Sequence, residues 1–356
     1  MTKESSVRYP SSGALTSRLL IALALTLYLS GCSSSSLSPS HSASANANAT
    51  LPTGAVAGYV WDSRVRGLRP VIGTLGAASL ERPVAGPAFR SAAPCPSHGF
   101  ALAADATGSI IAIVLPSGQA AKVGDAVAAD QQIALSPTCS DGLVYSPSRG
   151  SGLLISGLPS SSRAQTLTMS APGSLNGAAV SDSGAILLAV TKSDGTTLLK
   201  ILSPTGVAET LSTSLQKVGG IAFLPGTDSA IVADSAANTV YLGKQLSSGP
   251  SFTTIAAAAQ GVLNPRAVAA SADGHFAFVA NGAGNSLLRV DLTSNAAPLP
   301  IACRCSPTEL IPLDGNSFQI TDPAAGVIFA LNGGGQIPRT VFIPTDKVSA
   351  ATGGAQ

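Results

Sequence analysis

Residues 231–243 read IVADSAANTVYLG, and residues 278–292 read FVANGAGNSLLRVDL. Each stretch contains a short apolar run, a turn rich in Gly, Ala, Ser and Asn, and a second apolar run. Apolar runs of this length that end at turn residues are typical of strands, since they are too short for ordinary helices. Each stretch therefore predicts a β-hairpin.

The same pattern occurs seven times along the chain at a nearly constant spacing. The first strand of each unit ends, in order, at Asp62, Asp105, Ser146, Thr191, Asp234, Asn281 and Asp322. The steps between these positions are 43, 41, 45, 43, 47 and 41 residues. A further strand precedes several units across an Asp-Gly turn, which favours tight hairpins, and a fourth strand follows. Four antiparallel strands at this period are typical of a propeller blade, so the sequence predicts an all-β fold, a β-propeller of seven four-stranded blades.

Residues 231–243 and 278–292 resemble the YVTN/NHL-type propeller repeats of secreted and surface proteins. The resemblance implies a binding or scaffolding role, although related propellers include lactonase-like and lyase-like enzymes, and a fold by itself transfers no activity. Counts of six or eight blades stay open. The first unit begins at its second strand, so either residues 348–352 supply its inner strand or the first blade has three strands.

The N-terminus has the features of a processing segment. Lys3, Arg8 and Arg18 give it positive charge, and residues 19–29 (LLIALALTLYL) form an apolar core that is too short to span a bilayer of about 30 Å. Residues 29–32 (LSGC) resemble the lipobox of bacterial lipoproteins. The alternative is an ordinary signal peptide that has a cysteine near its end.

The lipobox resemblance implies cleavage before Cys32 and lipid on its thiol, which would anchor the chain to a membrane. Residues 1–31 are then a lipoprotein signal peptide, residues 32–52 a disordered tether rich in Ser, Ala and Asn, and residues 53–356 the propeller domain. An Asp after the lipidated cysteine would imply retention in the inner membrane. This chain has Ser33 there, so the resemblance implies sorting to the outer membrane. The expected location is the bacterial cell envelope, on a periplasmic or surface face.

The charge balance argues against nucleic acid as a partner. Removing residues 1–31 takes away three of the 20 basic residues and one of the 18 acidic residues, which leaves 17 of each. Nucleic-acid binders carry a basic excess or a basic stripe, and this chain has neither. No apolar run after Leu29 is long enough to predict a transmembrane span.

Acidic or amide side chains end the first strand in five of the seven units. These are Asp62, Asp105, Asp234, Asn281 and Asp322. In a propeller this strand end opens on one face, so the side chains would surround one mouth of the channel, where carboxylates could bind calcium. Asp62, Asp105, Asp234 and Asp322 are thus weak candidate calcium ligands, and no other cofactor is expected. The alternative, which we favour, is that each side chain caps its own turn.

Other residues near this mouth have two interpretations each. Arg64, Arg66 and Arg69 either bind a carboxylate or phosphate or lie in a solvated hairpin. Trp61 is either a core aromatic or a stacking platform for a sugar. We favour the solvated hairpin for the arginines and the core role for Trp61.

The chain offers little material for catalysis. Its three histidines are His41, His98 and His275, and no G-x-S-x-G motif is present. After the tether, glutamate occurs only at positions 81, 209 and 309. An enzyme is therefore the weaker interpretation, and its form would be a lactonase-like or hydrolytic propeller that uses acidic residues at the mouth, with calcium as its metal.

Four cysteines follow Cys32, which in an exported chain predicts disulfides. Cys95 and Cys139 fall in corresponding turns of consecutive units, and neighbouring blades bring such turns together, so we expect them to pair. Cys303 and Cys305 are then a close disulfide, free thiols or a metal-binding C-x-C pair.

These features favour a lipid-anchored envelope protein whose propeller binds or scaffolds another envelope protein or a glycan. A structural component without a discrete ligand is a third interpretation. An enzyme would need converging, partly buried carboxylates in the channel, whereas a binding module would show a broad exposed apolar patch on one face.

Overall fold

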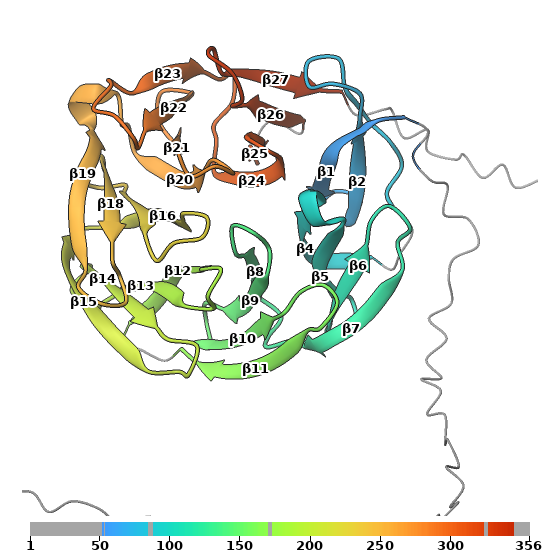
Figure 1. Ribbon diagram of the computed structural model, residues 1–356, viewed down its shortest axis with the longest axis horizontal. Coiled ribbons are helices and arrows are strands. Elements are labelled where there is room, and N and C mark those ends of the chain that lie inside the picture. Colours follow the sequence, from blue (N-terminus) through green and yellow to red (C-terminus); the bar gives the residue numbers. More distant parts are fainter. Residues whose placement is uncertain (1–51, 53, 85–87, 170–172, 324–326, 345–356) are drawn as a thin grey trace, which may run out of the picture. The chain divides into compact units, whose positions relative to one another are not determined.

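Short apolar runs flanked by Gly, Asp, Asn, Pro and Ser form nearly all of the regular structure as strands. The computed structural model describes residues 52, 54–84, 88–169, 173–323 and 327–344 (Figure 1). Residues 1–31, Cys32 and residues 348–352, on which several expectations rest, lie outside the described residues. Within the described ranges, the helical elements are two short 3-10 turns, η1 (Pro96–His98) and η2 (Ala258–Gln260).

The strands form seven antiparallel sheets that are arranged as blades around a central axis (Figure 1). Six sheets have four strands and one has three. Consecutive strands are neighbours in every sheet, so each blade is a meander. The prediction of an all-β, seven-bladed β-propeller is confirmed, and the alternatives of six or eight blades are wrong.

The blades follow the order of the chain, and the strands of each follow in chain order. Blade 1 contains β1 (Val56–Asp62), β2 (Gly67–Ile72) and β3 (Ser79–Leu80); blade 2 contains β4 (Phe89–Cys95), β5 (Phe100–Asp105), β6 (Ser109–Val114) and β7 (Ala120–Asp125). Blade 3 contains β8 (Gln132–Leu135), β9 (Asp141–Ser146), β10 (Ser151–Ser156) and β11 (Arg163–Thr168); blade 4 contains β12 (Ser174–Val180), β13 (Ile186–Thr191), β14 (Thr197–Leu202) and β15 (Ala208–Leu215). Blade 5 contains β16 (Val218–Phe223), β17 (Ala230–Asp234), β18 (Thr239–Lys244) and β19 (Ser251–Ala257). Blade 6 contains β20 (Pro265–Ala270), β21 (Phe276–Asn281), β22 (Ser286–Asp291) and β23 (Leu299–Ala302); blade 7 contains β24 (Glu309–Asp314), β25 (Ser317–Thr321), β26 (Ile328–Asn332) and β27 (Arg339–Ile343).

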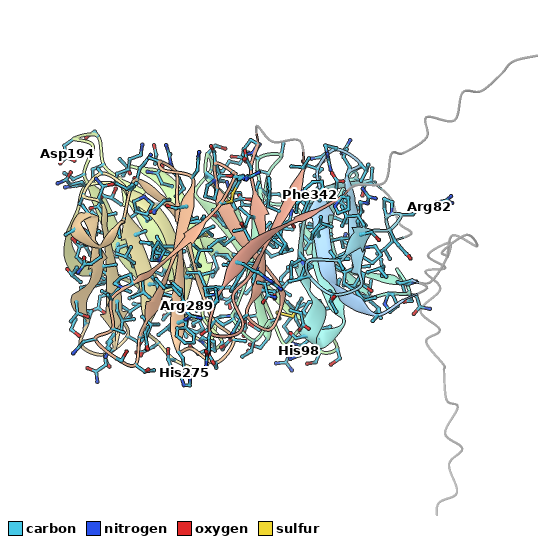
Figure 2. The ribbon with its side chains drawn as sticks, turned by 90° about the horizontal axis from the view of Figure 1, so that it is seen from above. Arg82, His98, Asp194, His275, Arg289 and Phe342 are labelled. Carbon is cyan, nitrogen blue, oxygen red and sulfur yellow. A yellow bond between two sulfur atoms is a disulfide. The ribbon has the colours of Figure 1, made fainter. Side chains whose placement is uncertain are left out.

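The two ends of the ring carry different turns. In a four-stranded blade, the turn between the first and second strands and the turn between the third and fourth strands open on one end, which we call the lower face. The turn between the second and third strands and the loops between blades open on the other end, the upper face. Figure 2 shows His98 and His275, from first turns of blades 2 and 6, at one rim and Asp194, from a middle turn of blade 4, at the opposite rim.

Each blade buries both of its faces against its neighbours. Phe278 of β21 and Phe318 of β25 are buried, with ring centroids 5.1 Å apart, and so join blades 6 and 7. Leu187 of β13 and Val232 of β17 lie in one buried cluster that joins blades 4 and 5. Because both faces are covered, the central strands have continuous apolar runs and not a simple alternation.

Blade 1 has no inner strand among the described residues. Its β1 contacts the innermost strands of both flanking blades, β24 and β4, and those two strands also contact each other. Gly58 permits this close approach, because a Cβ at its position would lie 3.1 Å from the Cβ of Leu313 and its φ is +149°. Of the two ring closures we considered, the described part of the chain shows the three-stranded first blade.

Hydrogen bonds link the lower turns of neighbouring blades at a separation of 44 residues. Asp182 of blade 4 accepts hydrogen bonds from the backbone N–H of Thr138 in blade 3 and of Gly226 in blade 5, each at 2.8 Å. Asn316 of blade 7 accepts one from the N–H of Ala272 in blade 6, also at 2.8 Å. These bonds tie the blades together along the lower rim.

The ionised form of Asp182 is the one that the fold stabilises. Partial burial opposes ionisation, but the hydrogen bonds donated by Gly226 and Thr138 outweigh it and hold the pKa of this carboxyl below its usual value. A group whose pKa is lowered by folding contributes stability above its unfolded pKa of about 4 and loses that contribution as the pH falls.

We predict that Asp182→Asn lowers the free energy of unfolding by about 1–2 kcal/mol near neutral pH, because an amide is a weaker acceptor than a carboxylate. The difference from the wild type should shrink as the pH falls from about 4, where the unfolded carboxyl begins to bind a proton, through the lowered pKa of the folded carboxyl. Urea unfolding at both pH values measures this. Asp228→Asn, in the next lower turn, is the matched control, since Oδ2 of Asp228 accepts only a 3.4 Å bond from the Ser247 N–H. If Asp182→Asn lowers the free energy of unfolding equally at both pH values, the ionised Asp182 carboxylate is not what ties the lower turns together.

Candidate functional site

Asp234, at the end of β17, is buried and surrounded by backbone donors. One oxygen accepts hydrogen bonds from the N–H of Ala236 (3.1 Å) and of Ala237 (3.0 Å), in its own turn. Its carboxylate also accepts bonds from the N–H of Gln216 (2.7 Å) and of Lys217 (3.1 Å), in the loop that enters the blade. The side chain thus holds two upper loops together.

The equivalent residues of other blades make similar contacts. Asp105 accepts bonds from the backbone N–H of Thr107 and of Ser109, each at 2.8 Å, and so caps its turn. Asn281 accepts a 2.9 Å bond from the N–H of Leu263 in the preceding loop. Asp322 likewise accepts a 2.8 Å bond from the N–H of Ser306. At this position the polar side chain accepts hydrogen bonds from the backbone of the surrounding loops.

In blade 3, two residues together make the contacts that one Asp or Asn makes in the other blades. Its second strand ends at Ser146, whose hydroxyl donates a 2.7 Å bond to Oδ1 of Asp130. Oδ2 of Asp130 then accepts a 3.1 Å bond from the N–H of Ser148. Sequence reasoning did not single out Asp130, because it lies in the loop before the blade and only the fold brings it to the turn.

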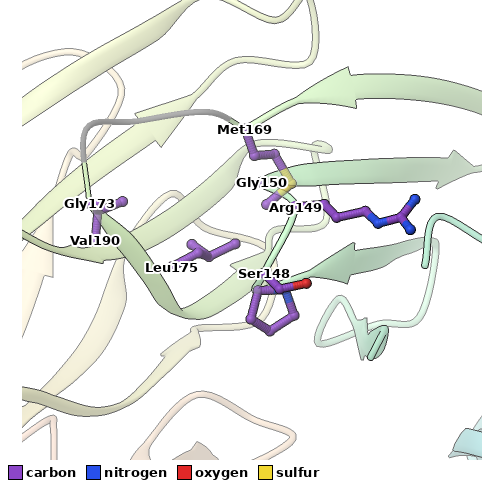
Figure 3. A pocket seen from close by; sticks show the side chains of 8 residues that line it. Ser148, Arg149, Gly150, Met169, Gly173, Leu175 and Val190 are labelled. Atoms are coloured by element: carbon purple, nitrogen blue, oxygen red, sulfur yellow. The ribbon is translucent and has the colours of Figure 1, made fainter. Parts of the chain in front are cut away.

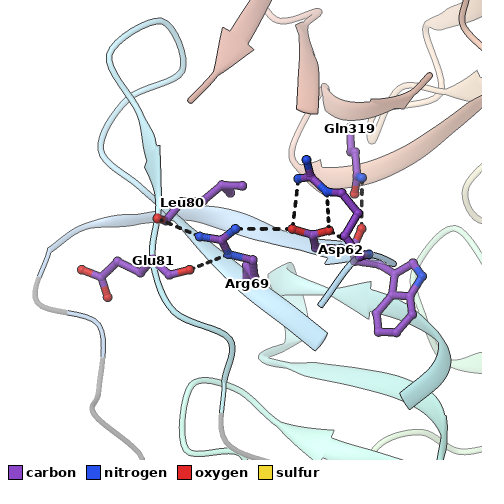
Figure 4. Close-up of polar contacts among 7 residues, drawn as sticks. Asp62, Arg69, Leu80, Glu81 and Gln319 are labelled. Carbon is purple, nitrogen blue, oxygen red and sulfur yellow. Dashed lines mark hydrogen bonds and ion pairs between the residues drawn. The ribbon is translucent and has the colours of Figure 1, made fainter. Parts of the chain in front are cut away.

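Asp62 lies in a network of arginines in blade 1 (Figure 4). It receives a 3.0 Å bond from Nε of Arg64 and a 3.3 Å bond from Nη1 of Arg69. Burial by itself would raise the pKa of Asp62, but the bonds from Arg64 and Arg69 outweigh it and hold the pKa below its usual value. The network therefore keeps the carboxylate ionised and hydrogen-bonded to the two arginines.

The three arginines of this blade are mainly structural. Arg69 is buried and donates to the carbonyl oxygens of Glu81 (2.7 Å) and Leu80 (3.3 Å), where the outer strand β3 is short (Figure 4). Arg66 donates to the carbonyl oxygen of Phe89 at 3.1 Å. Arg69 is thus committed to the protein's own carbonyl oxygens and to Asp62, so the expectation of a solvated hairpin is wrong for this residue. Arg66 is exposed and uses its Nε in the bond to Phe89.

Trp61 lies in the core. It is partly buried, packs against a buried cluster of blades 1 and 2, and has its ring centroid 6.4 Å from that of Phe89. This position supports the core role over the sugar-stacking role.

The candidate calcium ligands are spread over blades 1, 2, 5 and 7. Among the described residues, one group of three or more His, Cys, Asp or Glu side chains has ligand atoms close enough to share a cation, and it consists of Cys95, His98 and Cys139. The structure thus does not bring Asp62, Asp105, Asp234 and Asp322 together, and calcium would have to replace bonds that each already makes.

The four cysteines in the described part of the chain form two disulfides. Cys95 and Cys139 are bonded across the lower turns of blades 2 and 3, with Cα atoms 6.3 Å apart. Cys303 and Cys305 are bonded to each other, with Cα atoms 5.2 Å apart, and lie buried in the cluster between blades 6 and 7. The first bond closes a long loop, which in the chain-entropy model stabilises the fold by about 4 kcal/mol.

One small cleft of about 130 Å³ opens on the upper face between blades 3 and 4 (Figure 3). Met169, Leu175 and Val190 give it apolar walls, and Ser148 and Arg149 lie at its edge. Sites for drug-sized ligands have volumes of about 300–1,000 Å³, so this cleft is too small to enclose such a molecule. In Figure 3 the Arg149 guanidinium extends away from Met169 and Leu175.

The lower face carries a charge pattern that the analysis of single repeats missed. Aspartates lie in or beside the inner turns of five consecutive blades, and the inner turns of all six four-stranded blades contain no Lys or Arg within the described residues. The aspartates are Asp141, Asp182, Asp228, Asp273 and Asp314. The Asp-Gly and Asp-Ser signals at these turns were visible in the sequence, but only as hairpin signals.

Exposed apolar side chains surround these acidic turns. Four large ones lie at the outer turns of the lower face, in blades 2, 4, 6 and 7, and the two most exposed reach 69 % and 85 % exposure. They are Val114, Val207, Leu299 and Ile337. The lower face therefore combines acidic inner turns with exposed apolar side chains at four outer turns, while the exposed Arg163, Lys244 and Arg339 lie at the outer turns of blades 3, 5 and 7.

Comparison with known proteins identifies the fold alone. No protein-family model matches the chain, and no curated protein does. A functionally unknown protein from Desulfotomaculum acetoxidans is similar over 81 % of this chain and 99 % of its own, with a TM-score of 0.56 and 14 % identity. The Swd1 β-propeller domain of Myceliophteria thermophila is similar over 78 % of this chain and 97 % of its own, with a TM-score of 0.52 and 14 % identity. A chain of a nidogen/laminin complex is similar over 64 % of this chain and 86 % of its own, with a TM-score of 0.50 and 14 % identity.

Of the residues that the structure describes, none belongs to a helix with the length and apolar character required to cross a bilayer.

We predict that Asp234→Ala lowers the free energy of unfolding by about 3 kcal/mol or more, because four backbone N–H groups lose a charged acceptor in a buried site. Asp194→Ala is the matched control, since Asp194 is exposed and accepts hydrogen bonds from Thr196 in its own turn. Its cost should be much smaller than that of Asp234→Ala. Urea unfolding measures both variants, and equal costs would show that Asp234 does not hold the upper loops.

Proposed function

We propose that this chain is a lipid-anchored protein of the bacterial envelope whose propeller binds another envelope protein through its lower face. The anchor is supported by the LSGC sequence that ends at Cys32. The polar tether that follows, residues 33–52, would have an r.m.s. span of about 25 Å, which lets the propeller reach a partner near the membrane surface.

The observation that carries the binding role is the composition of the lower face. Five aspartates and no Lys or Arg lie at its described inner turns, and exposed apolar side chains lie at its outer turns. Exposed apolar residues that gather on one face favour association, while charge sets the orientation and the rate of encounter. The complementary partner is a protein surface with basic residues at its centre and apolar residues around them.

The charge of this face persists near neutral pH. Hydrogen bonds from the Ser271 hydroxyl and the His275 N–H hold the pKa of Asp273 below its usual value. The pKa of Asp182 is lowered as well, by the bonds from Gly226 and Thr138 that outweigh its burial. Both carboxylates therefore stay anionic and can attract a basic partner, with an effect that added salt would screen.

The other candidate functions draw less support from the site. General-acid chemistry by a carboxyl group needs a raised pKa, whereas hydrogen bonding lowers the pKa of Asp62 despite its burial, and that of Asp105 likewise. A glycan platform needs an accessible aromatic ring, and Trp61 packs in the core. A protein partner therefore fits this structure better than a sugar or a hydrolysed substrate.

We predict that Asp228→Lys with Asp314→Lys abolishes capture of the partner, because two of the five inner carboxylates become cations. The measurement is chemical crosslinking in intact envelopes followed by mass spectrometry of the purified complex. Asp125→Lys with Asp194→Lys, which makes the same two charge changes at exposed positions of the upper face, is the matched control and should leave capture unchanged. High salt should weaken capture by the wild type. If the protein crosslinks to no stoichiometric partner, or if both sets of variants behave alike, the lower-face proposal fails.

We predict that Cys32→Ser releases the protein from the membrane fraction, because the serine hydroxyl cannot carry the thioether-linked lipid. Fractionation and intact-mass measurement of the N-terminus report the outcome. Ser33→Ala is the matched control and should retain a lipidated, membrane-bound chain. A Cys32→Ser protein that stays membrane-bound would contradict the anchor, whatever the outcome of the crosslinking.

A further inference from the structure

The disulfide between Cys95 and Cys139 lies beside the imidazole of His98, on the lower face. Nδ1 of His98 is 3.5 Å from Sγ of Cys95, and the ligand atoms of all three residues lie within 4.8 Å of one another. We propose that reduction of this disulfide creates a Zn²⁺ site in which two thiolates and the His98 imidazole are the protein ligands. The inference does not depend on the proposed partner surface.

The distances suit a tetrahedral zinc ion. Zn–S and Zn–N bonds of about 2.3 and 2.0 Å place ligand atoms about 3.5–3.8 Å from one another. The imidazole already lies at this distance from Sγ of Cys95. The two sulfur atoms must separate, and Cα atoms 6.3 Å apart leave room for that by side-chain rotation. The ligand atoms of His98 and Cys139 already lie within 4.8 Å of each other. Three protein ligands leave the fourth position for water.

Local structure presents the three ligands on one side. The 3-10 turn η1 (Pro96–His98) returns the chain so that His98 faces the cysteine three residues before it. Cys139 comes from the neighbouring turn with a φ of +59°, a left-handed conformation that is uncommon for residues other than Gly. His98 is exposed and Cys139 is half-buried, so a reductant and an ion can reach the site from solvent.

The turn that carries Cys139 has other attachments that remain when the disulfide opens. Both the N–H and the hydroxyl of Thr138 donate to Asp182, at 2.8 and 2.7 Å. The N–H of Cys139 donates to the carbonyl oxygen of Ser136 at 2.8 Å. These bonds hold Cys139 near Cys95 in the reduced protein, so the two thiols are already close together when a metal ion binds.

The chemistry balances with a dithiol reductant of the thioredoxin class. A thiolate of the reductant attacks one sulfur of the disulfide and forms a mixed disulfide, and its second thiolate then releases the protein. The protein gains two electrons and two protons as Cys95 and Cys139 thiols, and the reductant becomes a disulfide. Binding of Zn²⁺ then displaces the two thiol protons, because thiolate is the ligand form.

The second cysteine pair provides an internal comparison. Cys303 and Cys305 are both buried, and no group of metal-ligating side chains in the described ranges includes them. Of the two described histidines, His98 contacts Cys95 and His275 contacts Asp273. Reduction of this pair should therefore not create a second zinc site of similar affinity.

The test is a zinc titration of the full-length protein, oxidised and reduced, followed by calorimetry, with Cd²⁺ as an ultraviolet probe of thiolate coordination. The reduced wild type should bind one Zn²⁺ per chain and the oxidised wild type none. His98→Ala keeps both cysteines and should weaken binding on the order of 10–100-fold, because one of three ligands is lost. His275→Ala, in the corresponding lower turn of blade 6, should leave binding unchanged.

Three outcomes would overturn the proposal. The first is equal affinity for reduced wild type and His98→Ala, which is also the result expected if reduction unfolds the chain and its thiols bind zinc without His98. Circular dichroism of each sample shows whether the strands persist. The second is zinc binding by the oxidised protein with the same affinity. The third is undiminished binding by a reduced variant that combines Cys95→Ser and Cys139→Ser.

Discussion

A blade of four strands has two apolar faces and can bury neither of them alone, and the rest of this structure follows from that constraint. The stacked rings of Phe278 and Phe318 are one instance of an interface between blades. Because every blade is covered on both sides, the chain has to repeat the unit until it returns to its start. The repeat period, the continuous apolar strands and the closed ring are consequences of one burial requirement.

The polar residues of the repeat mainly connect loops and blades, and within the described ranges they do not converge on one binding or catalytic site. Asp234 holds the loop that enters its blade, and Asp182 links three consecutive lower turns. The disulfide between Cys95 and Cys139 makes the same kind of connection covalently. Charged acceptors are thus placed where backbone N–H groups would otherwise lack partners, which leaves function to the surfaces that the loops present.

The two faces differ as a result. On the upper face, Asp234 accepts hydrogen bonds from the loops around it, and Asp62 is neutralised by Arg64 and Arg69. On the lower face, the inner turns keep aspartates with no Lys or Arg in the same turns, and exposed apolar residues lie at the outer turns of four blades. This asymmetry is the basis for proposing a protein partner on the lower face, and it places the His98 cluster on the same side.

The sequence by itself determined the strand pattern and the turn residues and favoured seven blades, because strands and hairpins depend on neighbours a few residues apart and the period is directly visible. It also favoured turn capping as the role of the strand-end aspartates, which the bonds of Asp105 show. Only the tertiary structure decided what depends on residues from different blades. The pairing of Asp130 with Ser146, the burial of Arg69 and the charge of the lower face are of this kind. Their partners are distant in sequence or belong to other repeats, and the ring has to close before they meet.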